Sequence, residues 1–157
     1  MEGIVPKEIS LEEAKDLGFQ VGCKRMGNGE IRVRLMRGTE RGSSGYIATV
    51  MPDDDCGWQN SHHHKGVQET YIVQSGWIGY AILMPDNSAK FFIYRAGQVF
   101  TTQVGEVHNV YMPCGAFIHT VKHGDCSQQH DWVGSEELDK LTQHVDEEEL
   151  HFLASEQ

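Results

Sequence analysis

Short runs rich in Val, Ile, Tyr, Phe and Thr dominate this chain from about residue 20 to about His123, and they limit the folds that it can form. Gly, Pro, Asp and Asn separate the runs at close intervals, as in sheets of short strands. The pattern predicts strands at Ile31–Met36, Ser44–Met51, His62–Lys65, Thr70–Gln74, Trp77–Leu83, Lys90–Arg95, Gln98–Thr102, His108–Met112 and Ala116–Lys122. Many short strands with turns between them indicate an all-β sandwich or barrel and not alternating βαβ units.

Helical patterns are confined to the two ends of the chain. Ser10 and Glu13 have the spacing of a capping box, and Gly18 ends the short helix that follows. Two further helices are predicted at Ser135–Leu141 and Asp146–Leu153, because their acidic first turns suit helix N-termini. We expect one domain with an N-terminal helical arm over 1–20, a β-barrel over 21–125 and C-terminal helices over 131–157.

The charge balance limits the partners of this chain. Its 157 residues carry a formal net charge of -10, which argues against a nucleic-acid partner, because nucleic-acid binding normally needs a basic face. No apolar run approaches the roughly 20 residues of a membrane span, and the N-terminus lacks the pattern of a secretory signal. The four cysteines are widely separated, which fits reduced thiols. We expect a cytoplasmic protein that binds a small molecule.

The segment Gly57–Gly76 predicts a metal site. His62 and His64 are two residues apart, so their imidazoles project from the same face of an extended strand. Glu69 follows a short bend and can return its carboxylate to the same point, and His108 can supply a third imidazole. Three imidazole nitrogens and one carboxylate suit one divalent transition metal ion, such as Fe, Mn, Ni or Zn, better than calcium or magnesium.

Two stretches of the chain resemble the conserved motifs of the cupin superfamily. The first stretch contains Gly57, His62, His64, Glu69 and Gly76, with one residue fewer after the first glycine than in the usual pattern. The second contains Gly97, Gly105 and His108, with Gln103 in place of the usual Pro and Met112 in place of the usual Asn. The resemblance covers about residues 45–122 and keeps all four ligand positions.

This resemblance implies a double-stranded β-helix, or jelly-roll barrel, with the ligand pocket inside, and it also implies a homodimer. It does not imply one reaction, because cupins include dioxygenases, isomerases, epimerases, lyases, storage proteins and sensing domains. The leading interpretation is a metal-dependent enzyme that acts on a small oxygenated metabolite by dioxygenase, isomerase or epimerase, or lyase chemistry. The alternatives are a non-catalytic small-molecule binding or sensing cupin and a metal-free sugar-processing cupin.

Two side chains are candidates for proton transfer, Glu69 and His119. In the last predicted strand Phe117, His119 and Val121 alternate with the residues between them, and this mostly apolar set is the expected interior face. His119 would then point into the pocket, where it could act as a general acid or base. The alternative is a core histidine that is hydrogen-bonded to the backbone.

Arginines gather just before the first motif, at Arg32, Arg34, Arg37 and Arg41. Arg32 and Arg34 share one face of a predicted strand and would suit a carboxylate or phosphate of the substrate. A strand that faces solvent carries the same pattern, and we favour this second interpretation because arginines are mostly exposed.

Overall fold

The predicted all-β class is confirmed by the computed structural model, which describes residues 7–39 and 42–156. The described strands form two sheets in which every pairing is antiparallel. The first sheet has the order β1 (Phe19–Arg25), β2 (Ile31–Thr39), β3 (Gly42–Val50), β11 (Phe117–Gly124), β6 (Val67–Ser75) and β9 (Val99–Thr101). The second has the order β12 (Trp132–Gly134), β5 (His62–His64), β10 (His108–Met112), β7 (Trp77–Leu83) and β8 (Ala89–Arg95), and β4 (Gly57–Trp58) also pairs with β10.

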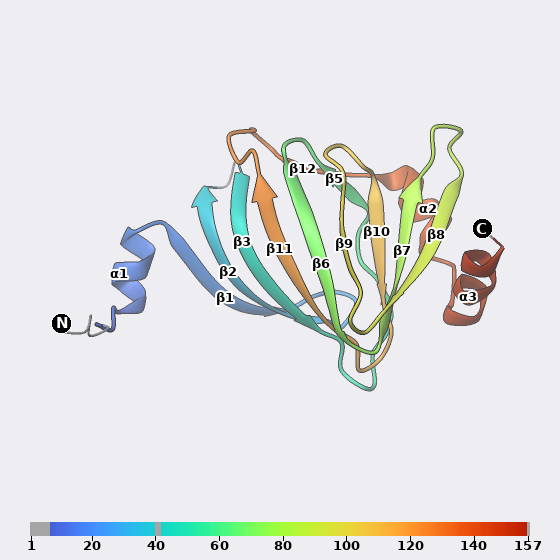
Figure 1. Cartoon of the computed structure of the whole chain (residues 1–157), viewed down its shortest axis with the longest axis horizontal. Coiled ribbons are helices and arrows are strands. Elements are labelled where there is room, and N and C mark those ends of the chain that lie inside the picture. Colours follow the sequence, from blue (N-terminus) through green and yellow to red (C-terminus); the bar gives the residue numbers. More distant parts are fainter. Residues whose placement is uncertain (1–6, 40–41, 157) are drawn as a thin grey trace.

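The core lies between the two sheets, whose strands converge at one end of the molecule and spread at the other (Figure 1). Side chains from both sheets form it: Met51, Tyr71, Val73, Ile78, Tyr80, Val110, Met112, Ala116 and Ile118. In β6 the buried residues Val67, Glu69, Tyr71 and Val73 alternate with half-buried ones. Because strand side chains alternate with a period of two, this apolar pattern also places Glu69 on the inner face of the barrel.

The N-terminal helix forms where the capping pattern predicts it. Helix α1 spans Leu11–Asp16, and the Ser10 hydroxyl accepts a hydrogen bond from the backbone N–H of Glu13 at 3.0 Å. None of its residues is buried, and it lies at one end of the molecule beyond β1 (Figure 1).

The C-terminal helices cover the opposite end of the molecule, next to β7 and β8 (Figure 1). They are α2 (Glu136–Thr142) and α3 (Glu147–Ser155). Leu138 and Leu150 are fully buried in a second apolar cluster with Trp58, Phe91 and Tyr111. An added Cβ at Gly79 would lie only 2.4 Å from Leu150 Cδ2, so the missing side chain of this glycine makes room for α3.

Three strands were not predicted: β4, which has only two residues, and the strands β1 and β12. β1 is an edge strand in which Phe19 is half-buried and the other residues are exposed, so it lacks the apolar alternation that marks a strand in sequence. It starts within the stretch predicted as the helical arm. β12 has three residues in the stretch predicted as helical, and it forms by pairing with β5. Both β1 and β12 depend on a neighbouring strand that local sequence does not show.

Residues 1–6 of the predicted arm, Arg41 and Gln157 lie outside the described residues. Within the described ranges, no helix has both the length and the apolar character that crossing a membrane requires.

We expect Leu150→Ala to lower the free energy of unfolding by about 2–5 kcal/mol, because it removes a fully buried side chain that anchors α3. Chemical denaturation would measure the change. Phe152→Ala is the matched control on the same helix, because Phe152 is 58% exposed, and it should change the stability by no more than about 0.5 kcal/mol. Equal effects of the two substitutions would contradict the docking of α3 through Leu150.

Candidate metal centre

The structure brings the four predicted ligand residues together inside the barrel. His62 and His64 lie on β5 with their side chains buried, whereas His63 between them is half-buried. Glu69 comes from β6, and His108 on β10 is paired in register with His62. The candidate ligand atoms of His62, His64 and Glu69 lie within 4.8 Å of one another, and His108 Nε2 is 3.1 Å from Glu69 Oε2.

The distances from Glu69 to the three imidazole nitrogens are similar to those between two ligand atoms of a single ion. Glu69 Oε2 lies 3.5 Å from His62 Nε2, 3.6 Å from His64 Nε2 and 3.1 Å from His108 Nε2. Two ligand atoms bound tetrahedrally to one zinc ion at about 2.0–2.1 Å are about 3.3 Å apart. His62, His64 and Glu69 thus form a compact group, and His108 adjoins it through its contact with Glu69.

Each imidazole is held by a hydrogen bond at its other nitrogen. His62 Nδ1 donates to the carbonyl of Asn60 at 2.9 Å, and His108 Nδ1 donates to the carbonyl of Glu106 at 2.9 Å. His64 Nδ1 donates to Asp131 Oδ2 at 2.5 Å. Because a carbonyl oxygen can only accept, the Nδ1 atoms of His62 and His108 carry their protons, and Nε2 is the atom of each ring that faces the centre.

Asp131 fixes His64 from a segment far along the chain. Its Oδ1 accepts the backbone N–H groups of Gly66 and Val67 at 2.9 and 3.2 Å, while Oδ2 accepts from His64. Burial raises the pKa of Asp131, but these N–H donors and the His64 ring outweigh it and leave the pKa below its ordinary value. Asp131 is therefore a carboxylate that orients His64 toward the centre.

Glu69 is a charged group at the middle of the site. Burial raises its pKa, but the imidazoles of His108, His62 and His64 and the Lys122 ammonium outweigh burial and hold the pKa well below its usual value. Tyr71 donates a hydrogen bond to Glu69 Oε2 at 2.9 Å. The centre thus combines one carboxylate with three imidazole nitrogens, which is a donor set for a divalent transition metal ion.

Burial has two further effects on the protonation of the site. Burial lowers the pKa of His62, which favours the neutral ring that can bind a metal ion at neutral pH. Burial and the neighbouring Glu69 charge raise the pKa of Tyr71 well above its ordinary value, so Tyr71 keeps its proton and stays a hydrogen-bond donor.

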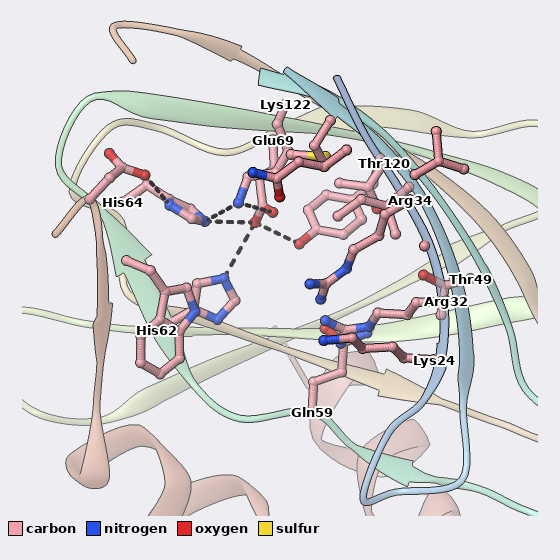
Figure 2. Close-up of a pocket in the computed structure, with 18 of the residues that line it drawn as sticks. Lys24, Arg32, Arg34, Thr49, Gln59, His62, His64, Glu69, Thr120 and Lys122 are labelled. Atoms are coloured by element: carbon pink, nitrogen blue, oxygen red, sulfur yellow. Dashed lines mark hydrogen bonds and ion pairs between the residues drawn. The ribbon is translucent and has the colours of Figure 1, made fainter. Parts of the chain in front are cut away.

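Lys122 is a cation within the site that the sequence did not reveal. Its Nζ lies 3.1 Å from His64 Nε2 and 3.5 Å from Glu69 Oε1 (Figure 2). The imidazoles of the other histidines approach Oε2, so Lys122 contacts the opposite oxygen of the same carboxylate. It can keep its ion pair with Oε1 while Oε2 serves as a ligand.

His62, His64 and Glu69 open onto a cavity of about 570 Å³ between the sheets. One wall, here called the histidine wall, carries His62, His64 and Glu69. The facing side, here called the cationic wall, carries Lys24, Arg32 and Arg34 from β1 and β2 (Figure 2). A second cavity of about 520 Å³ shares several of these lining residues. This volume fits a small-molecule ligand.

His119 does not line the cavity, and the prediction that it points inward is wrong. β11 alternates as predicted, but Thr120 and Lys122 belong to the cavity face and His119 to the other face. There His119 Nδ1 lies 2.5 Å from the hydroxyl of Tyr46, and the ring contacts Phe117. The interior face was chosen by apolar character, whereas a pocket wall is polar where it meets its ligand.

The arginines differ from the favoured interpretation as well. Arg32 and Arg34 line the cavity instead of facing solvent, whereas Arg37 is exposed and lies over the ring of Phe19. Arg41 lies outside the described residues. The even-numbered residues of β2, which include Arg32 and Arg34, point inward, whereas Arg37 lies on the outer face. Because the strand carries arginines on both faces, its sequence alone does not show which face lines the cavity.

Two residues of the site escaped the sequence analysis, Lys122 and Asp131, and Tyr71 was not assigned a role beside Glu69. Tyr71 shares the inner face of β6 with Glu69. Because it lies two residues after Glu69, its place beside the site could have been predicted from strand alternation. Lys122 pairs in register with Glu69 across the β11–β6 ladder, which depends on strand order. Asp131 lies in a polar segment with no periodic pattern, and no local signal identifies it.

Comparison with known proteins supports the fold. Neither a protein-family model nor a curated protein sequence matches the chain. Among solved structures, a protein with a double-stranded beta-helix domain from Klebsiella pneumoniae is 20% identical with a TM-score of 0.51, covering 84% of this chain and 99% of that one. Oxalate decarboxylase from Bacillus subtilis is 10% identical with a TM-score of 0.56, covering 85% of this chain and 40% of that one.

Oxalate decarboxylase from Lactobacillus farciminis, solved as a formate complex, is 11% identical with a TM-score of 0.52. The match covers 70% of this chain and 32% of the decarboxylase, so the chain spans about a third of the length of that enzyme. At these identities the likeness establishes the fold and leaves the activity to be argued from the site.

We expect Asp131→Asn to lower the free energy of unfolding by about 1–3 kcal/mol in protein treated with a chelator. The amide nitrogen of Asn cannot accept, so either the His64 ring or the two backbone N–H groups would lose their acceptor. Chemical denaturation measures the change, and Asp54→Asn at an exposed position is the control. A loss no larger than that of the control would show that Asp131 does not hold this corner of the site.

Proposed function

We propose that this chain, which has the double-stranded β-helix fold of the cupins, is a metal-dependent enzyme that acts on a small oxygenated metabolite. One observation carries the proposal: three imidazoles, two of them oriented by backbone carbonyls and one by Asp131, surround the buried carboxylate of Glu69. When the rings are neutral, their Nε2 lone pairs and the Glu69 carboxylate form a donor set that a divalent metal ion can bind.

A divalent ion held in this centre would supply Lewis-acid polarisation of a substrate oxygen. His62, His64, Glu69 and His108 would hold the ion. Because its low pKa makes Glu69 a weak base near neutral pH, we assign Glu69 to metal binding ahead of proton transfer.

The remaining chemistry falls to other side chains in the cavity. Lys122, on the same strand as His119, lines the cavity that His119 was expected to line. Its ammonium can hold a proton beside a bound substrate oxygen. Tyr71 stays protonated and donates to Glu69, which fixes the carboxylate. Trp132 lines the cavity, and its ring lies over that of His62 at 5.4 Å between centroids. Its indole therefore shields the His62 ring from water on that side.

The class of reaction stays open between dioxygenase, isomerase or epimerase, and lyase chemistry, since Fe, Mn, Ni and Zn all accept this donor set. Two of the similar structures are oxalate decarboxylases, and oxalate is a small oxygenated metabolite of the proposed kind. A non-catalytic binding or sensing cupin remains the second interpretation.

A metal-free sugar-processing cupin is the third interpretation, and the position of Lys122 favours it more than any other contact does. The ammonium donates a hydrogen bond to His64 Nε2, which is the atom that a metal ion would need. Bound metal in the purified protein would decide against this interpretation.

Elemental analysis of protein purified without chelators tests the proposal. We expect about one ion per chain, and loss of that ion in His62→Ala and in His108→Ala, because each substitution removes one of four ligands. His63→Ala is the matched control: it lies between two ligands, but its side chain projects to the other face of β5, so the ion should remain. Absence of metal from the native chain, even after reconstitution, would overturn the proposal.

We further expect Asp131→Asn to weaken metal binding by about 10–100-fold, because the carboxylate orients His64 and increases its basicity. Competition against a chelating dye measures the affinity. An unchanged affinity would mean that Asp131 supports the fold alone. In a separate experiment, oxygen uptake by the iron-loaded native protein would distinguish dioxygenase chemistry from isomerase, epimerase or lyase chemistry.

The homodimer and the cytoplasmic location stay predictions. Apolar side chains such as Val21, Val33 and Leu35 are exposed on the β1–β2 hairpin, which is compatible with a contact between two copies.

A further inference from the structure

The cationic wall is built into the inner face of the first sheet. Lys24 pairs in register with Arg32, which in turn pairs with Thr49, and Arg34 pairs with Ile47. Thr49 and Ile47 are buried, and side chains that share a row across a sheet share its face. The register therefore directs three cations of an acidic chain toward one cavity.

Arg34 lacks the partners that a half-buried arginine normally has. Its Nε is buried and has no hydrogen-bond partner, and within residues 7–39 and 42–156 no carboxylate forms an ion pair with it. Burial and then the neighbouring charge of Arg32 lower the pKa of Arg34, so its surroundings disfavour the positive charge. Arg32 differs, because it contacts the buried carboxylate of Glu30.

The surroundings of Arg34 leave room for a ligand. Gly22 is its register partner on β1, and an added Cβ at Gly22 would meet no atom within 4 Å. Lys24 and Arg32 face each other across the same two strands, which is unfavourable for like charges. An anion in this position would hydrogen-bond to the unpaired Arg34 and relieve the repulsion between the other two cations.

We infer that Arg34, with Arg32 and Lys24, forms an anion-binding subsite that faces the metal centre across the cavity, so that the metabolite carries a carboxylate or phosphate at one end. The inference rests on the proposed function, since it names the substrate class of the same site. Figure 2 shows the Arg34 guanidinium directed into the cavity from the side opposite His62 and His64.

The chemistry of the two walls selects such a ligand. A guanidinium forms two parallel hydrogen bonds with the oxygens of a carboxylate or phosphate, which gives orientation as well as affinity. The histidine wall binds oxygens through the ion. Since the same cavity of about 570 Å³ contains both walls, a small molecule with a chelating end and an anionic end would contact them together.

Calorimetric titration of zinc-loaded protein with matched probes tests this inference. L-malate differs from L-lactate, and 3-phosphoglycerate from glycerate, by one added anionic group beside the same 2-hydroxycarboxylate end. We expect at least one of the two-anion probes to bind about 10–100-fold more tightly than its one-anion counterpart. Tighter binding of malate would indicate that the subsite binds a carboxylate, and tighter binding of 3-phosphoglycerate would indicate that it binds a phosphate.

Arg34→Gln should abolish that preference while the zinc content and the affinity for lactate stay unchanged. Arg37→Gln is the matched control, because it removes the same charge from the exposed face of the same strand, and it should keep the preference. If Arg34→Gln does not fold, Arg34→Lys keeps the charge but loses the paired hydrogen bonds, and the preference should fall. The inference is overturned if neither two-anion probe is preferred or if the preference survives in these variants.

Failure of the proposed function would be seen separately. If the native chain binds no metal, the same proteins are titrated with inorganic phosphate alone. Phosphate binding that depends on Arg34 would uphold the anion subsite without the metal centre, and absence of such binding would overturn the subsite as well.

Discussion

The contact between one buried carboxylate and three imidazoles is the interaction on which the interior of this protein depends. Glu69 is 5% exposed, and a charge so far from water is costly unless other groups compensate it. His62, His64 and His108 come from two strands of the opposite sheet, so the carboxylate also holds the two sheets in a fixed relation. The contact also depends on the groups that hold its members in place, among them Tyr71, which donates to Glu69, and Asp131, which accepts from His64.

The two sheets divide the work of the pocket. β5 and β10 of the second sheet carry the three histidines, and β6 of the first sheet brings Glu69 to them. The outer strands of the first sheet, β1 and β2, carry the cationic wall. On the proposed function, a ligand between the walls would meet the metal centre on one side and the cationic wall on the other, and the two would orient it.

Much of the centre could be predicted because its spacing is local. Because His62 and His64 are two residues apart, their side chains lie on the same face of any extended strand. Glu69 follows His64 after a short bend. The all-β class followed from short strand patterns. What could not be predicted depends on strand order: Lys122 reaches Glu69 only through the β11–β6 register, and the inner face of β2 is defined by the strands that cover it. Asp131 is brought in by β12, which has no pattern of its own.

The cationic wall rests on the β1–β2 hairpin, and β1, whose side chains are largely exposed, contacts the rest of its sheet through β2 alone. Exchanges at the exposed positions of β1 should change stability little, whereas exchanges around Glu69, and of Arg32 beside the buried Glu30, would leave a buried charge without compensation. On the proposed function, the residues that select the substrate and those that bind the metal ion lie on different strands. Under that proposal, evolution or an engineer could redirect this scaffold to a different metabolite by exchanging Arg34 and Lys24 while the histidine wall is left unchanged.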